Sequence, residues 1–143
     1  MIPLIVIAGP TASGKTALAI ETAKLLDGEI ISADSMQVYK KMNIGTAKPD
    51  MEERSGIPHH LIDVKEPWED FSVSDFAELS HKAIVDIYSR GKMPILAGGT
   101  GLYIDNVVYN IKLSQESFDK RIREKLVRRS QEEGSAALLR ELS

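Results

Sequence analysis

The chain has 143 residues, 43% of them hydrophobic and 27% charged, which is typical of one folded domain and excludes a disordered or fibrous protein. It has no cysteine, which excludes disulfides, thiolate metal sites and cysteine nucleophiles and fits a cytoplasmic location. No apolar run is long enough to cross a bilayer, so we expect no membrane partner.

The net charge of −3 is unevenly distributed. Residues 1–113 carry 11 Lys/Arg and 15 Asp/Glu, whereas residues 114–143 carry 7 and 6. Six of the basic residues in the second part lie within ten positions: Lys120, Arg121, Arg123, Lys125, Arg128 and Arg129. This cluster permits an anionic partner, and a solvated helix face is the alternative.

The first elements alternate between strand and helix. A continuous apolar run predicts a strand buried on both faces over residues 4–8, and helical spacing predicts a helix over 15–26 that stops at Gly28. Residues 29–33 predict a second strand and residues 61–64 a weaker third. The glycine- and proline-rich stretch 42–58 predicts mostly loop.

The alternation continues beyond residue 70. Ser72 and Asp75 resemble a capping box that opens a helix ending before Gly91. Residues 94–97 predict a strand, and a helix follows to about residue 108. Strands alternating with helices predict an α/β fold with a mainly parallel sheet. After Asn110 the pattern changes to two helices, over 118–129 and 136–142, separated by Gly134.

The turn between the first strand and the first helix matches the phosphate-binding pattern G-x-x-x-x-G-K-[ST]. Its residues are Gly9, Pro10, Thr11, Ala12, Ser13, Gly14, Lys15 and Thr16. Backbone N–H groups and the Lys15 charge bind phosphate in such a loop, and the Thr16 hydroxyl is placed to bind Mg²⁺. ATP is the commonest ligand, but the loop fits any diphosphate. A hydrolase usually has a long apolar strand ending in a metal-binding Asp, which Asp63 matches poorly.

Two further turns follow strands at the edge where parallel sheets collect ligands. Asp34 ends the second strand, where it can act as a general base or a metal ligand, or cap the next segment. Thr100 stands among Gly98, Gly99 and Gly101. These glycines favour either close backbone approach to a ligand or a tight turn with positive φ.

Two smaller signals have plain alternatives. His59 and His60 are adjacent, so on a strand they point to opposite faces and favour roles in structure or toward a partner over a metal site. Lys48 is either a phosphate ligand or a solvated loop lysine.

Taken in this order, the motifs resemble the tRNA dimethylallyltransferase family (tRNA isopentenyltransferases, or IPP transferases). The phosphate loop alone is unspecific. The resemblance rests on its combination with residues 31–39 (ISADSMQVY), 44–49 (IGTAKP), 57–63 (IPHHLID) and 98–103 (GGTGLY). The family's P-loop NTPase-like fold implies an incomplete α/β core over residues 1–113 and the start of a helical tRNA-binding insertion over 114–143.

The resemblance implies transfer of a dimethylallyl group from dimethylallyl diphosphate to N6 of adenosine-37, in the anticodon loop of tRNA. The phosphate loop would hold the donor's diphosphate together with Mg²⁺. Asp34 would be the general base, Ser35, Met36 and Gln37 would hold the extruded base, and Thr100 would contact the tRNA or the reacting centre. Arg123 would contact tRNA, and the enzyme would be a cytoplasmic monomer.

Alternatives remain from the residues themselves. A P-loop kinase of a small metabolite would also use the phosphate loop, and related adenylate isopentenyltransferases prenylate free adenine nucleotides. Members of the family are longer than this chain, so the resemblance implies a truncated form, and a fragment that binds without catalysing is the third alternative.

Overall fold

The computed structural model describes residues 2–111 and 120–141. The chain divides into two compact units, Met1–Ile111 and Lys112–Ser143. The predicted boundary after residue 113 lies outside the described residues. No helix within the described ranges has the length and apolarity needed to cross a membrane.

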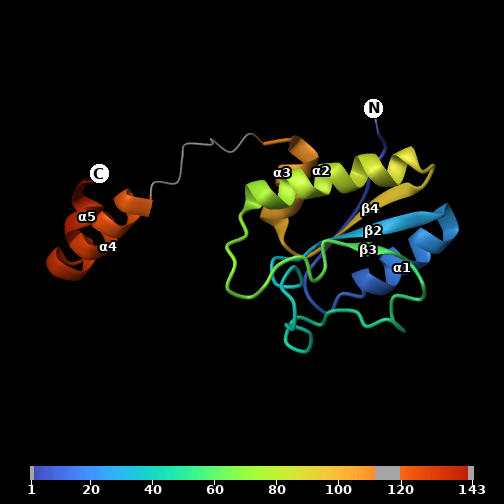
Figure 1. Cartoon of the computed structure of the whole chain (residues 1–143), viewed down its shortest axis with the longest axis horizontal. Helices are drawn as coiled ribbons and strands as arrows, with labels where there is room; N and C mark the ends of the chain where they lie inside the picture. The colour runs from blue at the N-terminus through green and yellow to red at the C-terminus, as the bar shows by residue number, and fades with distance from the viewer. Residues whose placement is uncertain (1, 112–119, 142–143) are drawn as a thin grey trace. The chain divides into compact units, whose positions relative to one another are not determined.

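The first unit contains a four-stranded parallel sheet in the order β1-β4-β2-β3 (Figure 1). Its strands are β1 (Ile5–Ala8), β2 (Gly28–Ala33), β3 (His59–His60) and β4 (Met93–Gly98). Its helices are α1 (Lys15–Leu26), α2 (Val73–Ser89) and α3 (Gly101–Tyr109). The predicted α/β fold with a parallel sheet is confirmed.

Helices cover both faces of the sheet. Because successive residues of a strand point to opposite faces, each central strand contributes apolar side chains to two helix layers. Ile30 and Ile95 pack in one buried cluster with Ala19, Ile20 and Ala23 of α1. Their neighbours on the two central strands face the second cluster, with α2 and α3. Its buried residues are Ile31, Ala33, Leu61, Phe76, Ile84, Ile87, Leu96, Tyr103, Ile104 and Val107. Burial on both faces explains why these strands read as continuous apolar runs.

The predicted capping box at the start of α2 is confirmed. The backbone N–H of Asp75 donates to Ser72 Oγ at 3.1 Å, and the N–H of Ser72 donates to Asp75 Oδ2 at 2.9 Å. Helix α1 spans the predicted residues 15–26, but Gly28 is not the residue that stops it. Asp27 adopts the left-handed conformation there (φ 47°), and Gly28 already belongs to β2, where a Cβ would lie 2.7 Å from the Met93 carbonyl oxygen.

The third strand was predicted at the wrong residues. It spans His59–His60, which pair with Ile30 and Ile31, rather than residues 61–64. Leu61 and Asp63 have φ values of 60° and 57°, in the left-handed region, so the chain cannot continue as a strand there.

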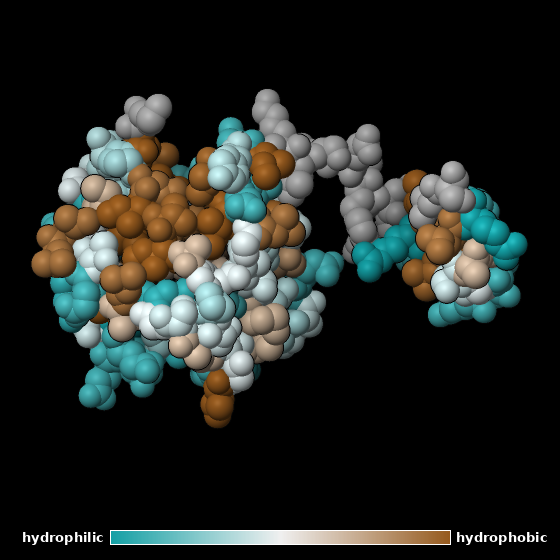
Figure 2. Space-filling model, turned by 180° about the vertical axis from the view of Figure 1, so that it is seen from behind, coloured by the Kyte–Doolittle hydropathy of each residue, from teal (hydrophilic) through white to brown (hydrophobic). Residues whose placement is uncertain are grey.

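The prediction that the first strand is buried on both faces is also wrong. β1 pairs only with β4 among the described strands and therefore lies at an edge of the sheet. Its residues alternate between half-buried and exposed, and Val6 is 38% exposed. Figure 2, seen from behind, shows apolar residues gathered on one face of the first unit.

The second unit contains α4 (Lys120–Glu133) and α5 (Ser135–Glu141), joined at Gly134 with φ 82°. The predicted pair of helices is confirmed, although residues 118, 119 and 142 lie outside the described ranges. The Arg129 guanidinium connects the two helices, because it donates hydrogen bonds to the carboxylates of Glu133 and Glu141. The pairing lowers the pKa of both carboxyl groups.

Candidate functional site

The phosphate-loop motif lies between β1 and α1, the context that its function requires. Ala12 and Gly14 adopt left-handed φ values of 63° and 81°, and Gly14 caps the helix. The Lys15 ammonium donates a 2.7 Å hydrogen bond to the carbonyl oxygen of Pro10, within its own loop. The Thr16 residue is exposed in the first turn of α1.

The glycine-rich turn after β4 packs directly against this loop. A Cβ at Gly98 would collide with the backbone of Ala33, and one at Gly99 would lie 3.2 Å from the Gly9 carbonyl oxygen and 3.8 Å from Lys15 Nζ. None of the glycines in this turn has a positive φ, so the predicted alternative of a tight turn with positive φ is wrong. Glycine is required here by close packing, which brings the β1, β2 and β4 ends together.

Asp34 directly follows β2 at the same edge and shapes the turn that begins there. Its Oδ1 accepts hydrogen bonds from the backbone N–H groups of Met36 at 2.9 Å and Gln37 at 3.2 Å. These bonds fix the orientation of the carboxylate. Within residues 2–111 and 120–141 its Oδ2 makes no hydrogen bond, which leaves one oxygen available to accept a proton.

Thr100 contacts the turn that contains Asp34. Its hydroxyl oxygen accepts a hydrogen bond from the Ser35 N–H at 3.1 Å and lies 3.4 Å from the Ser35 hydroxyl. The N–H of Thr100 donates to the Ala33 carbonyl at 3.1 Å. The structure therefore places Thr100 and Ser35 side by side next to Asp34.

The amide of Gln37 is hydrogen-bonded at both ends. Its Oε1 accepts from the Ser32 hydroxyl at 3.0 Å, and its Nε2 donates to the carbonyl oxygens of Thr46 at 3.0 Å and Ala47 at 3.3 Å. The side chain thus connects the end of β2 to the loop around residue 46, a role that spacing along the sequence does not reveal.

Lys48 is not a solvated loop lysine, because its side chain is buried in an ion pair. Its Nζ donates to Asp63 Oδ1 at 2.6 Å and to the Tyr39 carbonyl at 2.7 Å, and only 3% of the side chain is exposed. The Asp63 carboxylate is therefore paired with Lys48 and holds the loop in place.

The two adjacent histidines point to different surroundings, as predicted. His60 Nε2 donates to the buried Glu29 carboxylate at 2.8 Å. His59 Nδ1 donates to the Ile57 carbonyl at 2.8 Å, and burial lowers the pKa of this imidazole. Among the described residues no group of three or more His, Cys, Asp or Glu side chains is placed to hold a metal.

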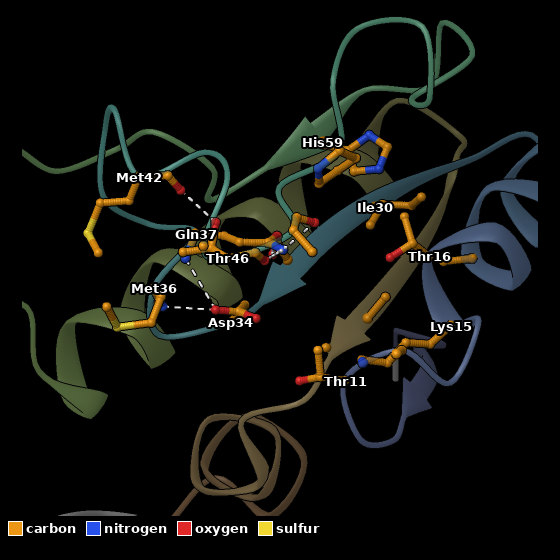
Figure 3. Close-up of a pocket in the computed structure, with 18 of the residues that line it drawn as sticks. Thr11, Lys15, Thr16, Ile30, Asp34, Met36, Gln37, Met42, Thr46 and His59 are labelled. Carbon is orange, nitrogen blue, oxygen red and sulfur yellow. Dashed lines mark hydrogen bonds between the residues drawn. The ribbon is translucent and has the colours of Figure 1, made fainter.

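One cavity of about 460 Å³, within the range of small-molecule sites, unites most of the predicted side chains (Figure 3). The predicted residues that line it are Thr11, Ala12, Lys15, Thr16, Asp34, Met36 and Gln37. Gly9, Pro10, Ser13 and Gly14 belong to the same loop, and Ser35 and Thr100 to the adjoining turns, without lining the cavity. Arg123 lies on α4 in the second unit and is exposed.

The cavity also has lining residues for which the sequence did not predict a place in the site. They include Met42, and also Ile44, Thr46 and His59 from the two segments 44–49 and 57–63 that carried the family resemblance. For Met42 and Ile44, the signal that could have identified them is the presence of apolar side chains within a glycine- and proline-rich loop.

The donor set suits Mg²⁺ only in combination with phosphate. Mg²⁺ commonly binds one or two protein ligands and completes its octahedral shell with phosphate oxygens and water. The Thr16 hydroxyl at the start of α1 and the Asp34 carboxylate line the same cavity. A phosphate-bound Mg²⁺ fits these residues, and the described carboxylates form no cage of their own.

Comparisons with known proteins agree with these motifs. A family model described as IPP transferase matches residues 37–143. The tRNA dimethylallyltransferase of Acetivibrio thermocellus is 58% identical over 135 residues, covering 94% of this chain and 43% of that protein. The tRNA dimethylallyltransferase of Staphylococcus aureus (strain JH9) is 60% identical over 114 residues, covering 80% of this chain and 37% of that protein.

Solved structures give the same result. The full-length tRNA isopentenylpyrophosphate transferase of Bacillus halodurans has a TM-score of 0.79 at 48% identity, covering 100% of this chain and 47% of that one. A eukaryotic dimethylallyltransferase acting on tRNA has a TM-score of 0.69 at 38% identity, covering 92% of this chain and 36% of that one. The chain therefore spans less than half the length of these relatives. It belongs to the IPP transferase family.

Proposed function

We propose that this chain supplies the donor site and the general base of a transferase that moves a dimethylallyl group from dimethylallyl diphosphate to N6 of adenosine-37 in tRNA. The observation that carries the proposal is that Lys15 of the phosphate loop and Asp34, directly after β2, line one cavity. A diphosphate bound to Lys15 and an amine next to Asp34 would therefore lie in the same site.

The phosphate loop holds the diphosphate that leaves. The Lys15 ammonium exchanges its bond to the Pro10 carbonyl for one to a phosphate oxygen, and the backbone N–H groups of the loop add further donors. The Thr16 hydroxyl would hold a phosphate-bound Mg²⁺, which would supply positive charge against the charge that develops on the diphosphate as the C–O bond breaks.

Asp34 receives the proton. The exocyclic N6 attacks the allylic carbon as diphosphate departs, and its proton passes to Oδ2, the oxygen that the Met36 and Gln37 N–H groups leave available. An exocyclic amine in a stacked base cannot reach a cavity, so the adenine must be extruded. Ser35, Met36, Gln37 and Thr100 lie beside Asp34 and are the residues we assign to contact the extruded adenine.

The second unit contributes contacts to tRNA phosphates, in our proposal through Arg123 and its basic neighbours on α4. Arg129 is excluded from this role by its bonds to Glu133 and Glu141, which hold the two helices together. We infer that the protein works in the cytoplasm, where its tRNA substrate is available.

Calorimetric titration with dimethylallyl diphosphate, ATP and AMP, each with Mg²⁺, tests the donor assignment. The proposal predicts that the prenyl diphosphate binds more tightly than ATP. Preferential binding of ATP would instead favour a small-molecule kinase. Tight binding of AMP beside the donor would favour prenylation of free nucleotides and would contradict tRNA as the acceptor.

A further inference from the structure

The side chain of Lys48 is buried, which is unusual for a lysine. Only 3% of it is exposed, whereas the other lysines that form ion pairs within residues 2–111 and 120–141 are at least 30% exposed. Its ammonium donates to Asp63 Oδ1 at 2.6 Å and to the Tyr39 carbonyl at 2.7 Å. Because a buried charge is costly unless it is paired, these two bonds determine where the ammonium lies and which backbone segments it joins.

Asp63, the partner of Lys48, lies in a strained turn. Leu61 and Asp63 adopt left-handed conformations directly after β3, with φ values of 60° and 57°. Leu61 is buried in the core, although this conformation is unfavourable for a bulky side chain. Strained conformations persist only where the surrounding structure enforces them, and they are common at functional sites. The bond from Lys48 holds the Asp63 side chain and is one of the contacts that enforce this turn.

The turn after β3 pairs with the segment that follows Asp34. The N–H of Asp63 donates to the Gln37 carbonyl at 3.1 Å. The N–H of Val64 donates to the carbonyl of Val38 at 2.8 Å, and Val38 is fully buried. The N–H of Gln37 in turn donates to Asp34 Oδ1 at 3.2 Å (Figure 3). Asp63 is therefore connected to the Asp34 carboxylate through the backbone of a single residue, Gln37.

We propose that Lys48 and Asp63 are positioning residues that hold the Asp34 carboxylate in the orientation it needs to accept a proton. This rests on the proposed function of Asp34 as the general base and deepens it. Proton transfer requires the accepting oxygen to lie within hydrogen-bond distance of the amine, and a small displacement of that oxygen slows the reaction. The ion pair keeps Gln37 in place, and Gln37 keeps Oδ1 bonded, which leaves Oδ2 to accept the proton.

The location of the ion pair separates this role from ligand binding. Neither Lys48 nor Asp63 lines the cavity, whereas Lys15 and Asp34 do. Removing the pair should therefore leave the binding of phosphate by Lys15 unaltered. An ion pair that only stabilised the fold would change the free energy of unfolding without acting through Asp34.

Two variants of the chain test the pair. Lys48→Met keeps the length and the apolar stem of the side chain and removes both of its hydrogen bonds. Lys82→Met is the matched control, because Lys82 forms an equally short ion pair of 2.6 Å with Glu78 on the exposed surface of α2. A difference between the two variants therefore reports the location of the pair and not the loss of a lysine.

The first readout is hydrogen exchange, measured by NMR in the chain itself, at the N–H groups of Met36 and Gln37 that bond to Asp34 Oδ1. We expect exchange to be about tenfold faster in Lys48→Met and unchanged in Lys82→Met, because the segment opens locally once the pair is lost. Calorimetric titration with inorganic pyrophosphate and Mg²⁺ should give the wild-type affinity in both variants. Unchanged exchange in a folded Lys48→Met chain would overturn the proposal.

The second readout is the single-turnover rate of transfer, in an enzyme that has the full length of a family member and contains this chain. Lys48→Met should slow transfer about tenfold, with the affinity for dimethylallyl diphosphate unchanged. In the Asp34→Asn background the same substitution should slow transfer by less than about twofold, because no carboxylate is left to position. An equal loss in both backgrounds would show that Lys48 acts independently of Asp34, which contradicts a positioning role.

Failure of the proposed base and failure of this inference give different results. An unaltered rate in Asp34→Asn overturns the proposed base and with it the positioning role. A slow Asp34→Asn enzyme, combined with a wild-type rate in Lys48→Met, overturns the positioning role alone.

Substitutions of Asp63 keep the proposal testable if Lys48→Met does not fold. Asp63→Ala removes the acceptor of the Lys48 ammonium, whereas Asp63→Asn keeps an oxygen there and tolerates a left-handed φ. We expect Asp63→Ala to slow transfer about tenfold and Asp63→Asn to slow it by less than about twofold. Equal rates in these two variants would overturn the proposal.

Discussion

The backbone N–H of Ser35 donates a 3.1 Å hydrogen bond to the hydroxyl of Thr100, a residue 65 positions away in the sequence. The bond joins the turn after β2 to the turn after β4. Because Asp34 precedes Ser35 directly, the bond also restrains the carboxylate that we propose as the base. Its contribution is therefore both to stability and to the placement of Asp34.

Replacing Thr100 by Val keeps the shape of the side chain and removes the hydroxyl oxygen that accepts from the Ser35 N–H. We expect the free energy of unfolding to fall by about 1 kcal/mol, the usual value of such a bond, and Thr100→Ser to retain most of it. Urea denaturation of both variants is the measurement. Equal stability of the Val variant and the wild type would mean that the bond contributes nothing.

Lys15→Ala should weaken binding of dimethylallyl diphosphate by at least about tenfold, because a hydrogen bond between charged groups is lost. The melting temperature should change little, since among the described residues the Lys15 ammonium bonds only to the Pro10 carbonyl. Lys24→Ala is the matched control, because Lys24 lies on the same helix and pairs with Glu21 at the surface. Equal affinities of the two variants would refute the phosphate-loop assignment.

Acid stability should depend on Glu29. The Arg90 guanidinium, assisted by His60, lowers the pKa of this buried carboxyl from 4.5 to about 2, in spite of the opposing effect of burial. Because the pKa is lower in the folded state, the stabilisation is complete above the unfolded pKa of about 4.5 and is lost as the pH falls toward 2.

Unfolding measured between pH 6 and pH 3 should therefore show a steeper decline for the wild type than for Glu29→Gln. Arg90→Gln should cost more stability at pH 7 than Glu29→Gln, because it leaves a carboxylate that is 3% exposed without its main partner, whereas Arg90 itself is 40% exposed. A larger loss of stability in Glu29→Gln than in Arg90→Gln would show that the unpaired guanidinium costs more than the unpaired carboxylate.

Arg123→Ala should weaken tRNA binding and reduce its salt dependence by about 0.9 log units per log unit of salt, the slope for one phosphate contact in a duplex. The measurement is tRNA affinity across a salt series, in a protein that includes the complete helical insertion. Arg129→Ala should instead destabilise the helix pair without changing the slope, because Arg129 is bonded to Glu133 and Glu141. Parallel slopes for Arg123→Ala and the wild type would mean that the basic cluster is a solvated face.

Patterns of neighbouring residues in the sequence correctly predicted the structural features that depend on neighbouring residues. The glycine spacing identified the phosphate loop, the capping box identified the start of α2, and apolar runs such as 29–33 and 94–97 identified the central strands. The third strand was misplaced because apolar composition at residues 61–64 does not reveal that Leu61 and Asp63 adopt left-handed conformations.

The rest depends on contacts between residues far apart in sequence. Glu29 and Arg90 are 61 positions apart, and nothing near either residue indicates the ion pair. The burial of Lys48 against Asp63 and the amide bonds of Gln37 likewise follow from how the loop folds back on β2. The motifs selected residues of the phosphate loop and of the turn after β2, but they did not reveal that the loop 42–49 folds over the same cavity.

In one transfer reaction, Lys15 binds the diphosphate of the donor and Asp34 accepts the proton of the acceptor amine. The most direct test of these two roles uses an enzyme with the full length of a family member. This chain replaces the matching segment of the Bacillus halodurans enzyme, which it covers at 48% identity. The hybrid is incubated with labelled dimethylallyl diphosphate, Mg²⁺ and unmodified tRNA, and single-turnover incorporation of label is measured.

We predict that label enters tRNA carrying adenosine-37, that tRNA with guanosine at that position stays unlabelled, and that Asp34→Asn slows incorporation by about 10² or more. The asparagine oxygen still accepts from the Met36 and Gln37 N–H groups, so the turn should persist. A folded hybrid that binds donor and tRNA yet transfers no label, or an Asp34→Asn hybrid that transfers at the unaltered rate, would contradict the account.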